Sequence, residues 1–252
     1  MRDLENKSVL ITGANRGIGF ELLKHFSNLK CNIICCTRET NDEFLKKIDE
    51  IKLKNKVKID NYILDLANFE SIKSSFKKIS SEQTKIDILI NNAGILYNAL
   101  FLMTTLPQIE NTYKINVISQ IYLTQLVAKK MMTKKTGNII FFSSSSAREN
   151  NFGRSLYSSS KSAIESLTKS LSKELGAYNI RVNAIAPGPV NTEMFEKNTN
   201  EENINKILKR TALKKIATTS DIANLASFLA SNTSSHINGE IISINGGLSI
   251  DE

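Results

Sequence analysis

The sequence predicts an α/β fold, a single domain built on a doubly wound parallel β-sheet of about seven strands with helices on both faces. The main observation is that apolar runs of strand length alternate with amphipathic stretches of helix length along the whole chain. Such alternation produces parallel strands joined by right-handed crossovers. The size and composition agree, because 252 residues with 41% hydrophobic and 23% charged side chains suit one globular domain, residues 1–252.

The individual elements follow from the apolar runs and the helical patterns between them. The predicted strands are residues 8–12, 32–37, 57–66, 86–91, 138–143, 181–186 and 240–245. The predicted helices are residues 16–29, 42–53, 69–80, 106–132, 156–178 and 221–230, with Thr219 or Ser220 as the N-cap of the last. Ligands of such sheets bind at the carboxyl ends of the strands, so we examine the residues that follow each strand.

Composition excludes several classes of function. The net charge of +8 comes largely from lysines in residues 46–58 and 129–135, which are not interleaved with aromatic residues and form no nucleic-acid-binding motif. We interpret them as solvated helix faces whose excess charge attracts an anionic cofactor or an acidic carrier protein. Apolar runs are too short to cross a membrane, and the first residues lack the apolar core of a signal peptide, so we expect a cytoplasmic protein.

The three cysteines, Cys31, Cys35 and Cys36, lie in one short apolar run. That arrangement suits neither a disulfide framework nor a metal site, since no second cluster completes it. We interpret them as small buried residues of a strand in a reducing compartment, and we expect no metal.

A glycine-rich turn follows the first strand, in Thr12-Gly13-Ala14-Asn15-Arg16-Gly17-Ile18-Gly19. The first glycine permits a tight turn, the second lets backbone approach a pyrophosphate, and the third lets the helix pack close to the sheet. A diphosphate there meets the free N–H groups and positive dipole of the helix. The expected cofactor contacts of this loop are Gly13, Asn15, Arg16, Gly17, Ile18 and Gly19.

The second strand ends at Thr37-Arg38, where a carboxylate would bind the ribose hydroxyls of NAD. A hydroxyl and a guanidinium stand there instead, and a guanidinium grips a phosphate bidentately. Arg16 reaches the same phosphate from the glycine loop. We therefore expect NADPH or NADP+ rather than NADH.

Further cofactor contacts are expected at the ends of the later strands. Asp65 and Leu66 end the third strand, where the carboxylate accepts from an adenine amino group. Small residues in Asn91-Asn92-Ala93-Gly94 end the fourth strand and allow close backbone approach. The turn after the sixth strand, which could seat a nicotinamide carboxamide, adds Pro187, Gly188, Val190 and Thr192.

A tyrosine and a lysine stand one helical turn apart in Tyr157-Ser158-Ser159-Ser160-Lys161. A neighbouring ammonium lowers the pKa of a phenol from about 10 toward the range useful for acid–base catalysis. Taken alone, the pair is more typical of a packed tyrosine beside a lysine that reaches solvent. The serines 143–146 at the end of the fifth strand supply hydroxyls able to donate to a substrate carbonyl.

Taken together, these motifs resemble the short-chain dehydrogenase/reductase family, with its Rossmann-type fold, over residues 7–248. The resemblance rests on Thr12-Gly13-x-x-x-Gly17-Ile18-Gly19, Asn91-Asn92-Ala93-Gly94, Tyr157-x-x-x-Lys161 and Pro187-Gly188 in order. Within the family, residues 183–188 and 239–247 are most similar to the 3-oxoacyl-[acyl-carrier-protein] reductase branch.

The resemblance implies a catalytic set of Asn116, Ser144, Tyr157 and Lys161. Tyr157 would protonate the carbonyl, Lys161 would lower its pKa and hold the nicotinamide ribose, and Asn116 would kink a helix and hold a water of the proton relay. Ser144, thirteen residues before the tyrosine, would polarise the carbonyl, with Ser145 as the alternative.

The same resemblance implies an NADPH-dependent carbonyl reductase acting on 3-oxoacyl thioesters, a homotetramer, and a mobile lid over about residues 191–212. Docking of acyl carrier protein in the family uses arginines, and this chain has Lys135 and Tyr178 at those positions. The charged loop 147–156 also departs from what a simple acyl chain requires. The alternatives are a dehydrogenase or reductase of a sugar or other small alcohol, and a non-catalytic NADP-binding regulatory protein.

Overall fold

A parallel sheet of seven strands forms the centre of the computed structural model, which describes residues 2–149 and 151–248. Its strand order, β3-β2-β1-β4-β5-β6-β7, reverses between β1 and β4 and so confirms the predicted doubly wound topology. The strands are β1 (Ser8–Thr12), β2 (Asn32–Thr37), β3 (Ile59–Ile63), β4 (Ile88–Asn91), β5 (Gly137–Phe142), β6 (Ile180–Pro187) and β7 (Ile241–Ile244).

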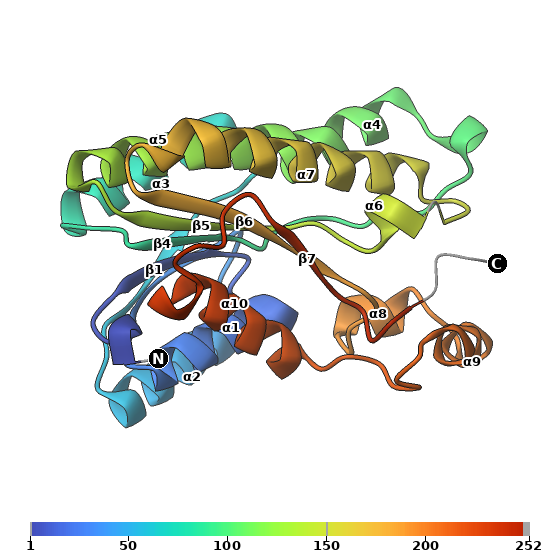
Figure 1. Ribbon diagram of the computed structural model, residues 1–252, viewed down its shortest axis with the longest axis horizontal. Coiled ribbons are helices and arrows are strands. Elements are labelled where there is room, and N and C mark those ends of the chain that lie inside the picture. Colours follow the sequence, from blue (N-terminus) through green and yellow to red (C-terminus); the bar gives the residue numbers. More distant parts are fainter. Residues whose placement is uncertain (1, 150, 249–252) are drawn as a thin grey trace.

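Helices cover both faces of this sheet (Figure 1). One face carries α1 (Gly17–Asn28), α2 (Asp42–Asn55) and α10 (Thr219–Ala230); the other carries α3 (Phe69–Glu82), α4 (Leu106–Tyr113), α5 (Ser119–Lys134) and α7 (Ser155–Gly176). The short helices α6 (Ser146–Glu149), α8 (Glu193–Lys197) and α9 (Glu201–Arg210) lie beyond the carboxyl ends of the strands.

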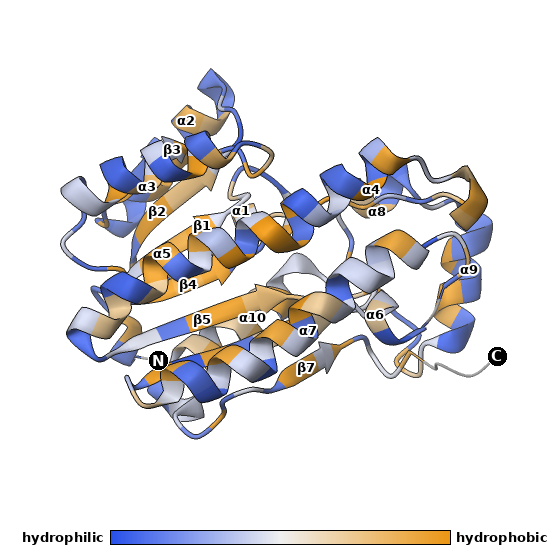
Figure 2. Cartoon of the chain, turned by 90° about the horizontal axis from the view of Figure 1, so that it is seen from above, coloured by the Kyte–Doolittle hydropathy of each residue, from blue (hydrophilic) through white to orange (hydrophobic). Residues whose placement is uncertain are grey.

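Two hydrophobic cores result, one on each face of the sheet. Successive residues of β1 alternate between them, because Val9 and Ile11 pack with α1 and α10 while Leu10 packs with the opposite cluster. All five residues of β1 are buried, as a strand covered on both faces requires. Figure 2 shows the same pattern as apolar strands between helices that are polar on their outer faces.

Most element boundaries differ from the sequence prediction by one to a few residues, and two of these differences move a predicted residue. The third strand is shorter than residues 57–66, so Asp65 and Leu66 lie in the turn after β3 rather than at its last position. The N-cap of α10 is Thr218, not Thr219 or Ser220. Thr218 is preferred because its side chain and the carboxylate of Asp221 cap each other's backbone N–H groups, at 3.2 and 2.8 Å.

The predicted helix over residues 106–132 is interrupted. Between α4 and α5 the backbone forms a π-helical segment, Lys114–Ile118, whose wider turn contains Asn116. The predicted kink at Asn116 therefore takes the form of a π segment.

Several helices and turns end in left-handed backbone conformations. Lys56 follows α2 with φ 54°, and Lys135 follows α5 with φ 48°. Lys30 and Lys214 have φ values of 62° and 51°. These positions favour glycine, yet lysine occupies all four.

The predicted burial of the cysteines is confirmed, because Cys31, Cys35 and Cys36 are buried free thiols. Cys35 and Cys36 lie in β2, as predicted, whereas Cys31 precedes the strand. Burial raises the pKa of Cys36 to about 12, so this thiol stays protonated and unreactive near neutral pH. Over residues 2–149 and 151–248, no helix combines the length and the apolar character that crossing a bilayer requires.

Candidate active site

Tyr157 and Lys161 lie in the first half of α7, close to the carboxyl end of β5. The ammonium of Lys161 is 5.8 Å from the centroid of the Tyr157 ring, as the helical spacing predicts. Lys161 is only 4% exposed, and its Nζ donates to the carbonyl oxygen of Phe142 at 2.8 Å. Burial lowers the pKa of Lys161 to about 8, so its positive charge is costly to maintain in this position.

Ser144 is the second residue beyond β5, and its hydroxyl is hydrogen-bonded to the phenol of Tyr157. Burial raises the pKa of Tyr157, while a hydrogen bond from Ser144 and the charge of Arg154 partly oppose that shift. The direction is opposite to the one expected from Lys161, whose ammonium is directed at the Phe142 carbonyl instead. The hydrogen bond to Tyr157 favours Ser144 over Ser145 as the hydroxyl of the site.

Asn116 is completely buried within the π segment and is fixed by three hydrogen bonds. Its Oδ1 accepts from the backbone N–H of Ile95 at 2.8 Å, and its Nδ2 donates to the carbonyl of Ile95 at 2.9 Å and to Ser160 Oγ at 3.1 Å. A Cβ atom added to Gly94 would lie 3.2 Å from Asn116 Oδ1 and 3.4 Å from Lys161 Nζ. All four predicted catalytic residues thus lie around one point at the ends of β4 and β5.

The glycine loop has the geometry that its sequence predicts. Gly13 and Gly17 have φ values of 66° and 52°, and a Cβ on Gly19 would lie 2.0 Å from the carbonyl oxygen of Gly13. Asn92 supports the loop by donating to the carbonyl oxygens of Thr12 and Gly13, at 2.9 and 3.3 Å. The side chain of Arg16, the N-cap residue of α1, makes no capping hydrogen bond, which leaves the first N–H groups of the helix available to an anion.

The residues expected to select NADPH over NADH differ in whether they are open to a ligand: the two arginines are exposed and Thr37 is buried. Arg38 is 71% exposed, and its guanidinium lies 3.0 Å from the carboxylate of Glu39, a neighbour that the sequence prediction did not consider. Arg16 lies 4.0 Å from Glu193 of α8. Thr37 corrects the prediction: it is buried in β2, and its hydroxyl donates to Asn61 Oδ1 at 3.1 Å, so it is not open to a phosphate.

The remaining predicted contacts border the same end of the sheet. Asp65 accepts the backbone N–H of Ala67 at 2.9 Å, and Leu66 is buried. Gly188 packs so closely on Asn245 that an added Cβ would lie 2.8 Å from the Cβ of that residue.

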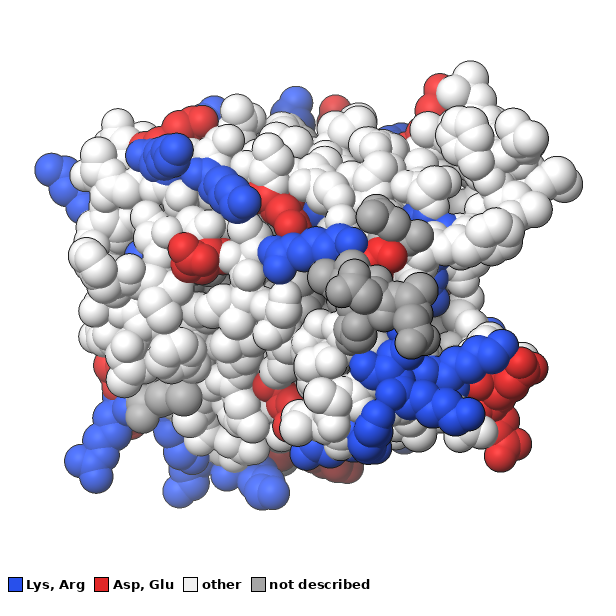
Figure 3. Space-filling model, turned by 45° about the vertical axis from the view of Figure 1, so that its right-hand side comes forward, with Lys and Arg blue, Asp and Glu red and all other residues white. Residues whose placement is uncertain are grey.

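The turn beyond β6 leads into the predicted lid. Val190 forms a parallel bridge with Ala217, and Thr192 accepts the N–H of Phe195 at 3.2 Å and so caps α8. The lid region consists of α8, α9 and the segment after them, and Figure 3 shows basic and acidic side chains gathered on this part of the surface. Asn98, from the turn after β4, lies 3.5 Å from Asn198 at the end of α8.

One charge of the loop 147–156 is paired with an opposite charge: Arg148 contacts Glu165 of α7 at 3.3 Å. Arg154 Nη1 donates to the neutral Ser146 Oγ at 3.2 Å, and its charge acts on the phenol of Tyr157. The loop therefore keeps a positive charge beside the proposed active site. Sequence reasoning missed the Glu165 partner, because it comes from a different element and no local motif marks it.

Comparisons with known proteins agree with this geometry. Residues 13–249 match the family model described as "Enoyl-(Acyl carrier protein) reductase". The chain is 36% identical over 245 residues to the 3-oxoacyl-[acyl-carrier-protein] reductase FabG of Buchnera aphidicola, covering 97% of this chain and 98% of that protein. The corresponding protein of Aquifex aeolicus is 35% identical over 246 residues, with the same coverage.

Solved structures show the same fold. A 7α-hydroxysteroid dehydrogenase complexed with NADH and 7-oxo glycochenodeoxycholic acid has a TM-score of 0.92 and 30% identity, covering 99% of this chain and 98% of its own. A putative gluconate 5-dehydrogenase from Beutenbergia cavernae with bound NADP has a TM-score of 0.91 and 25% identity, with 98% of both chains covered. The chain belongs to the short-chain dehydrogenase/reductase family.

Proposed function

We propose that this protein is an NADPH-dependent carbonyl reductase whose leading activity is the reduction of 3-oxoacyl thioesters to 3-hydroxyacyl products. The observation that carries the proposal is the convergence of Tyr157, Ser144 and Lys161 beside the glycine loop. An acid, a carbonyl-polarising hydroxyl and a nucleotide cradle at one end of a sheet are the parts that carbonyl reduction requires.

The residues of the cradle fit a dinucleotide. The uncapped first turn of α1 offers N–H groups to a pyrophosphate, and Gly19 leaves no side chain between that turn and the loop. Arg38 and Arg16 are the cations available to a 2′-phosphate on the adenosine ribose, and they support NADPH over NADH. When bound, the nicotinamide supplies the hydride, and the protein supplies the rest of the chemistry.

In the proposed reaction, Ser144 donates a hydrogen bond to the substrate carbonyl oxygen and stabilises the negative charge that develops there. Tyr157 donates its phenolic proton to the same oxygen, which completes the alcohol. Lys161 is held beside the phenol and stabilises the resulting phenolate. Asn116 holds the backbone of Ile95 near Lys161, where we place the entry of the proton that restores Tyr157.

The choice of 3-oxoacyl thioesters rests on the curated relatives, several of which are named 3-oxoacyl-[acyl-carrier-protein] reductases and match 31–36% of aligned residues over nearly the whole chain. Exposed apolar side chains on the turn after β4, including Phe101 and Leu102 at 75% and 92% exposure, suit an acyl chain near the site. The gluconate and hydroxysteroid enzymes among the structural relatives support reduction of a sugar or another alcohol as the second candidate.

Partner binding and assembly belong to the same proposal. Acyl carrier protein would meet Lys135 after α5 and Tyr178 after α7, one of them basic, and the resemblance to the family supports a homotetramer.

The test compares wild type with Tyr157→Phe on acetoacetyl thioesters of carrier protein and coenzyme A, with sugars and ketones as the comparison panel. We expect wild type to reduce the thioesters fastest and the variant to lose about 10³-fold in kcat, since a positioned acid contributes about 10²–10⁴-fold. NADPH binding should be retained. Equal inactivity of both proteins toward the whole panel, with NADPH still bound, would favour the non-catalytic alternative.

A further inference from the structure

Glu165, which is outside the predicted catalytic set, is hydrogen-bonded to the segment that carries Ser144. Ser143, the last residue before Ser144, donates from its Oγ to Glu165 Oε1 at 2.9 Å. The same hydroxyl lies 3.4 Å from the carbonyl oxygen of Lys161. Glu165 stands one helical turn after Lys161 and two turns after Tyr157, so one face of α7 carries all three side chains.

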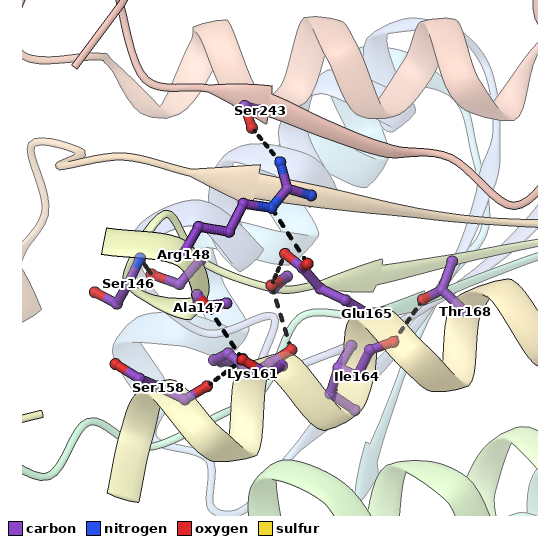
Figure 4. A network of polar contacts seen from close by, with 12 residues as sticks. Ser146, Ala147, Arg148, Ser158, Lys161, Ile164, Glu165, Thr168 and Ser243 are labelled. Atoms are coloured by element: carbon purple, nitrogen blue, oxygen red, sulfur yellow. Dashed lines mark hydrogen bonds and ion pairs between the residues drawn. The ribbon is translucent and has the colours of Figure 1, made fainter. Parts of the chain in front are cut away.

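Arg148 holds the other oxygen of this carboxylate. Its Nε lies 3.3 Å from Glu165 Oε2, while its Nη1 donates to Ser243 Oγ of β7 at 3.1 Å. The Glu165 side chain is 15% exposed and that of Arg148 is 39% exposed, so the carboxylate is better shielded from water than the guanidinium. Figure 4 shows Arg148 extending from α6 between β7 and α7, with Glu165 directed toward it.

A second hydrogen bond joins α7 to the chain that follows Ser144 in sequence. Ser162 of α7 donates to the carbonyl oxygen of Ala147 at 3.1 Å. Ser144 therefore lies in a short segment fixed to α7 before and after it. Because Tyr157 is on α7 as well, these hydrogen bonds set the separation between the two groups that must act on one carbonyl oxygen.

We propose that Glu165, held by Arg148, is a positioning residue that fixes Ser144 relative to Tyr157 through the Ser143 hydroxyl. The proposal rests on the proposed carbonyl reductase function. Glu165 touches no reacting atom; it acts by keeping the serine donor at the distance that the substrate oxygen requires. Misplacement of a catalytic group by about 1 Å costs up to about 10²-fold in rate, which sets the size of the expected effect.

The kinetic test uses Glu165→Gln, Ser143→Ala and the double variant. We expect each single variant to lose about 10- to 100-fold in kcat, with the NADPH dissociation constant unchanged within about twofold. The double variant should lose no more than the worse single variant, because both changes act on one linkage: Glu165→Gln removes the charge that Arg148 holds, and Ser143→Ala removes the donor to residue 165. Arg148→Lys should retain more activity than Arg148→Ala, since it keeps a positive charge beside Glu165.

The matched control is Glu174→Gln, which removes the same charge from an exposed position of the same helix. It should behave as wild type. Full kcat in Glu165→Gln, or additive losses in the double variant, would overturn the proposal. If Glu165→Gln fails to fold, Ser143→Ala alone decides, because it leaves the Arg148–Glu165 pair in place.

A second readout does not depend on turnover. Tyr157 faces Ser144, Arg154 and Lys161, and loss of the Ser144 hydrogen bond should raise the pKa of the phenol. Titration of ring-labelled tyrosine by NMR, with Tyr157→Phe to assign the signal, measures that shift in Glu165→Gln. An unchanged pKa would overturn the positioning role. A wild type that reduces no carbonyl compound would contradict the proposed function alone, because this titration still tests Glu165.

Discussion

The two ends of the proposed cofactor groove are built differently. At the catalytic end, Asn116 is fully buried and Lys161 is 4% exposed, and each is fixed by hydrogen bonds to backbone carbonyl or N–H groups. At the end where the adenosine ribose would lie, Arg38 and Arg16 have side chains that are 71% and 60% exposed, and each is near a carboxylate.

This difference separates side chains whose positions are fixed by the fold from surface side chains that can change position. The groups proposed to take part in proton transfer are held by the sheet and by α7, so their geometry does not depend on a bound ligand. The arginines that would read a phosphate are held only by surface ion pairs, which contribute about 0–1 kcal/mol. We therefore expect changes at the catalytic end to alter rates and stability strongly, and changes at the other end to alter cofactor preference.

The largest effect should come from removing the buried charge at the catalytic end. In the folded protein the pKa of Lys161 is about 8, against 10.5 for an ordinary lysine. Between these pH values the unfolded chain binds more protons, so the free energy of unfolding of wild type should rise with pH relative to Lys161→Met. The change should total about 3 kcal/mol, and denaturant titrations across that range measure it.

Lys169→Met provides the control for this measurement, because Lys169 is exposed on the same helix. The difference in the free energy of unfolding between Lys169→Met and wild type should not depend on pH. If the difference in the free energy of unfolding between Lys161→Met and wild type were also independent of pH, the lowered pKa of Lys161 would be contradicted.

Gly19→Ala tests the close packing of α1 against the glycine loop, which the proposed pyrophosphate site requires. The new Cβ would lie 2.0 Å from the Gly13 carbonyl and 2.7 Å from Asn92 Nδ2, so the loop must move away from its present position. We expect NADPH affinity to fall about 100-fold, with about 1–3 kcal/mol lost in stability from overpacking. Fluorescence titration with NADPH and thermal unfolding measure the two losses. Gly176→Ala is the control, since its nearest contact would be an ordinary 3.8 Å.

Arg38→Asp acts at the exposed end alone. Replacing the guanidinium by a carboxylate should weaken NADPH binding about 10- to 100-fold through charge repulsion and leave NADH binding nearly unchanged. The ratio of the two dissociation constants is the quantity to measure. An equal loss for both cofactors would show that Arg38 does not contact the 2′-phosphate.

Glu39→Gln should change NADPH affinity least, and it should raise that affinity where Arg38→Asp lowers it. Arg38 and Glu39 are 3.0 Å apart, and releasing the arginine frees it for a phosphate. Because an exposed pair contributes about 0–1 kcal/mol, we expect NADPH affinity to rise about two- to fivefold. The gain should vanish in the Arg38→Asp background. A loss of affinity on Glu39→Gln would mean that the carboxylate orients Arg38 productively.

The fold could be predicted from sequence because its determinants are periodic. Apolar runs identified every strand of the sheet, and only the ends shifted, as with Asp65 and Leu66, because pairing partners decide where a strand stops. The clustering of the four proposed catalytic residues could be predicted because the helical spacing of Tyr157 and Lys161 and the glycine loop are local patterns that resemble a known family.

The rest depends on contacts between distant residues. Thr37 looked available at a strand end, but its hydroxyl is satisfied by Asn61 on the neighbouring strand. Glu165 and Arg148 are 17 residues apart and share no motif, so only the packing of α6 against α7 brings them together. The direction of the Tyr157 pKa shift was also missed, because burial outweighs a lysine that is directed elsewhere.

The left-handed lysines that end helices and turns have a consequence for engineering and evolution. Lys30, Lys56, Lys135 and Lys214 adopt backbone conformations that cost an L-residue about 1 kcal/mol and a glycine almost nothing. None of them belongs to the catalytic set. Lys135 is also proposed to meet acyl carrier protein, so we set it apart from the other three. Glycine at Lys30, Lys56 or Lys214 should raise the free energy of unfolding, and that gain would offset destabilising changes in substrate specificity without altering the proposed reaction centre.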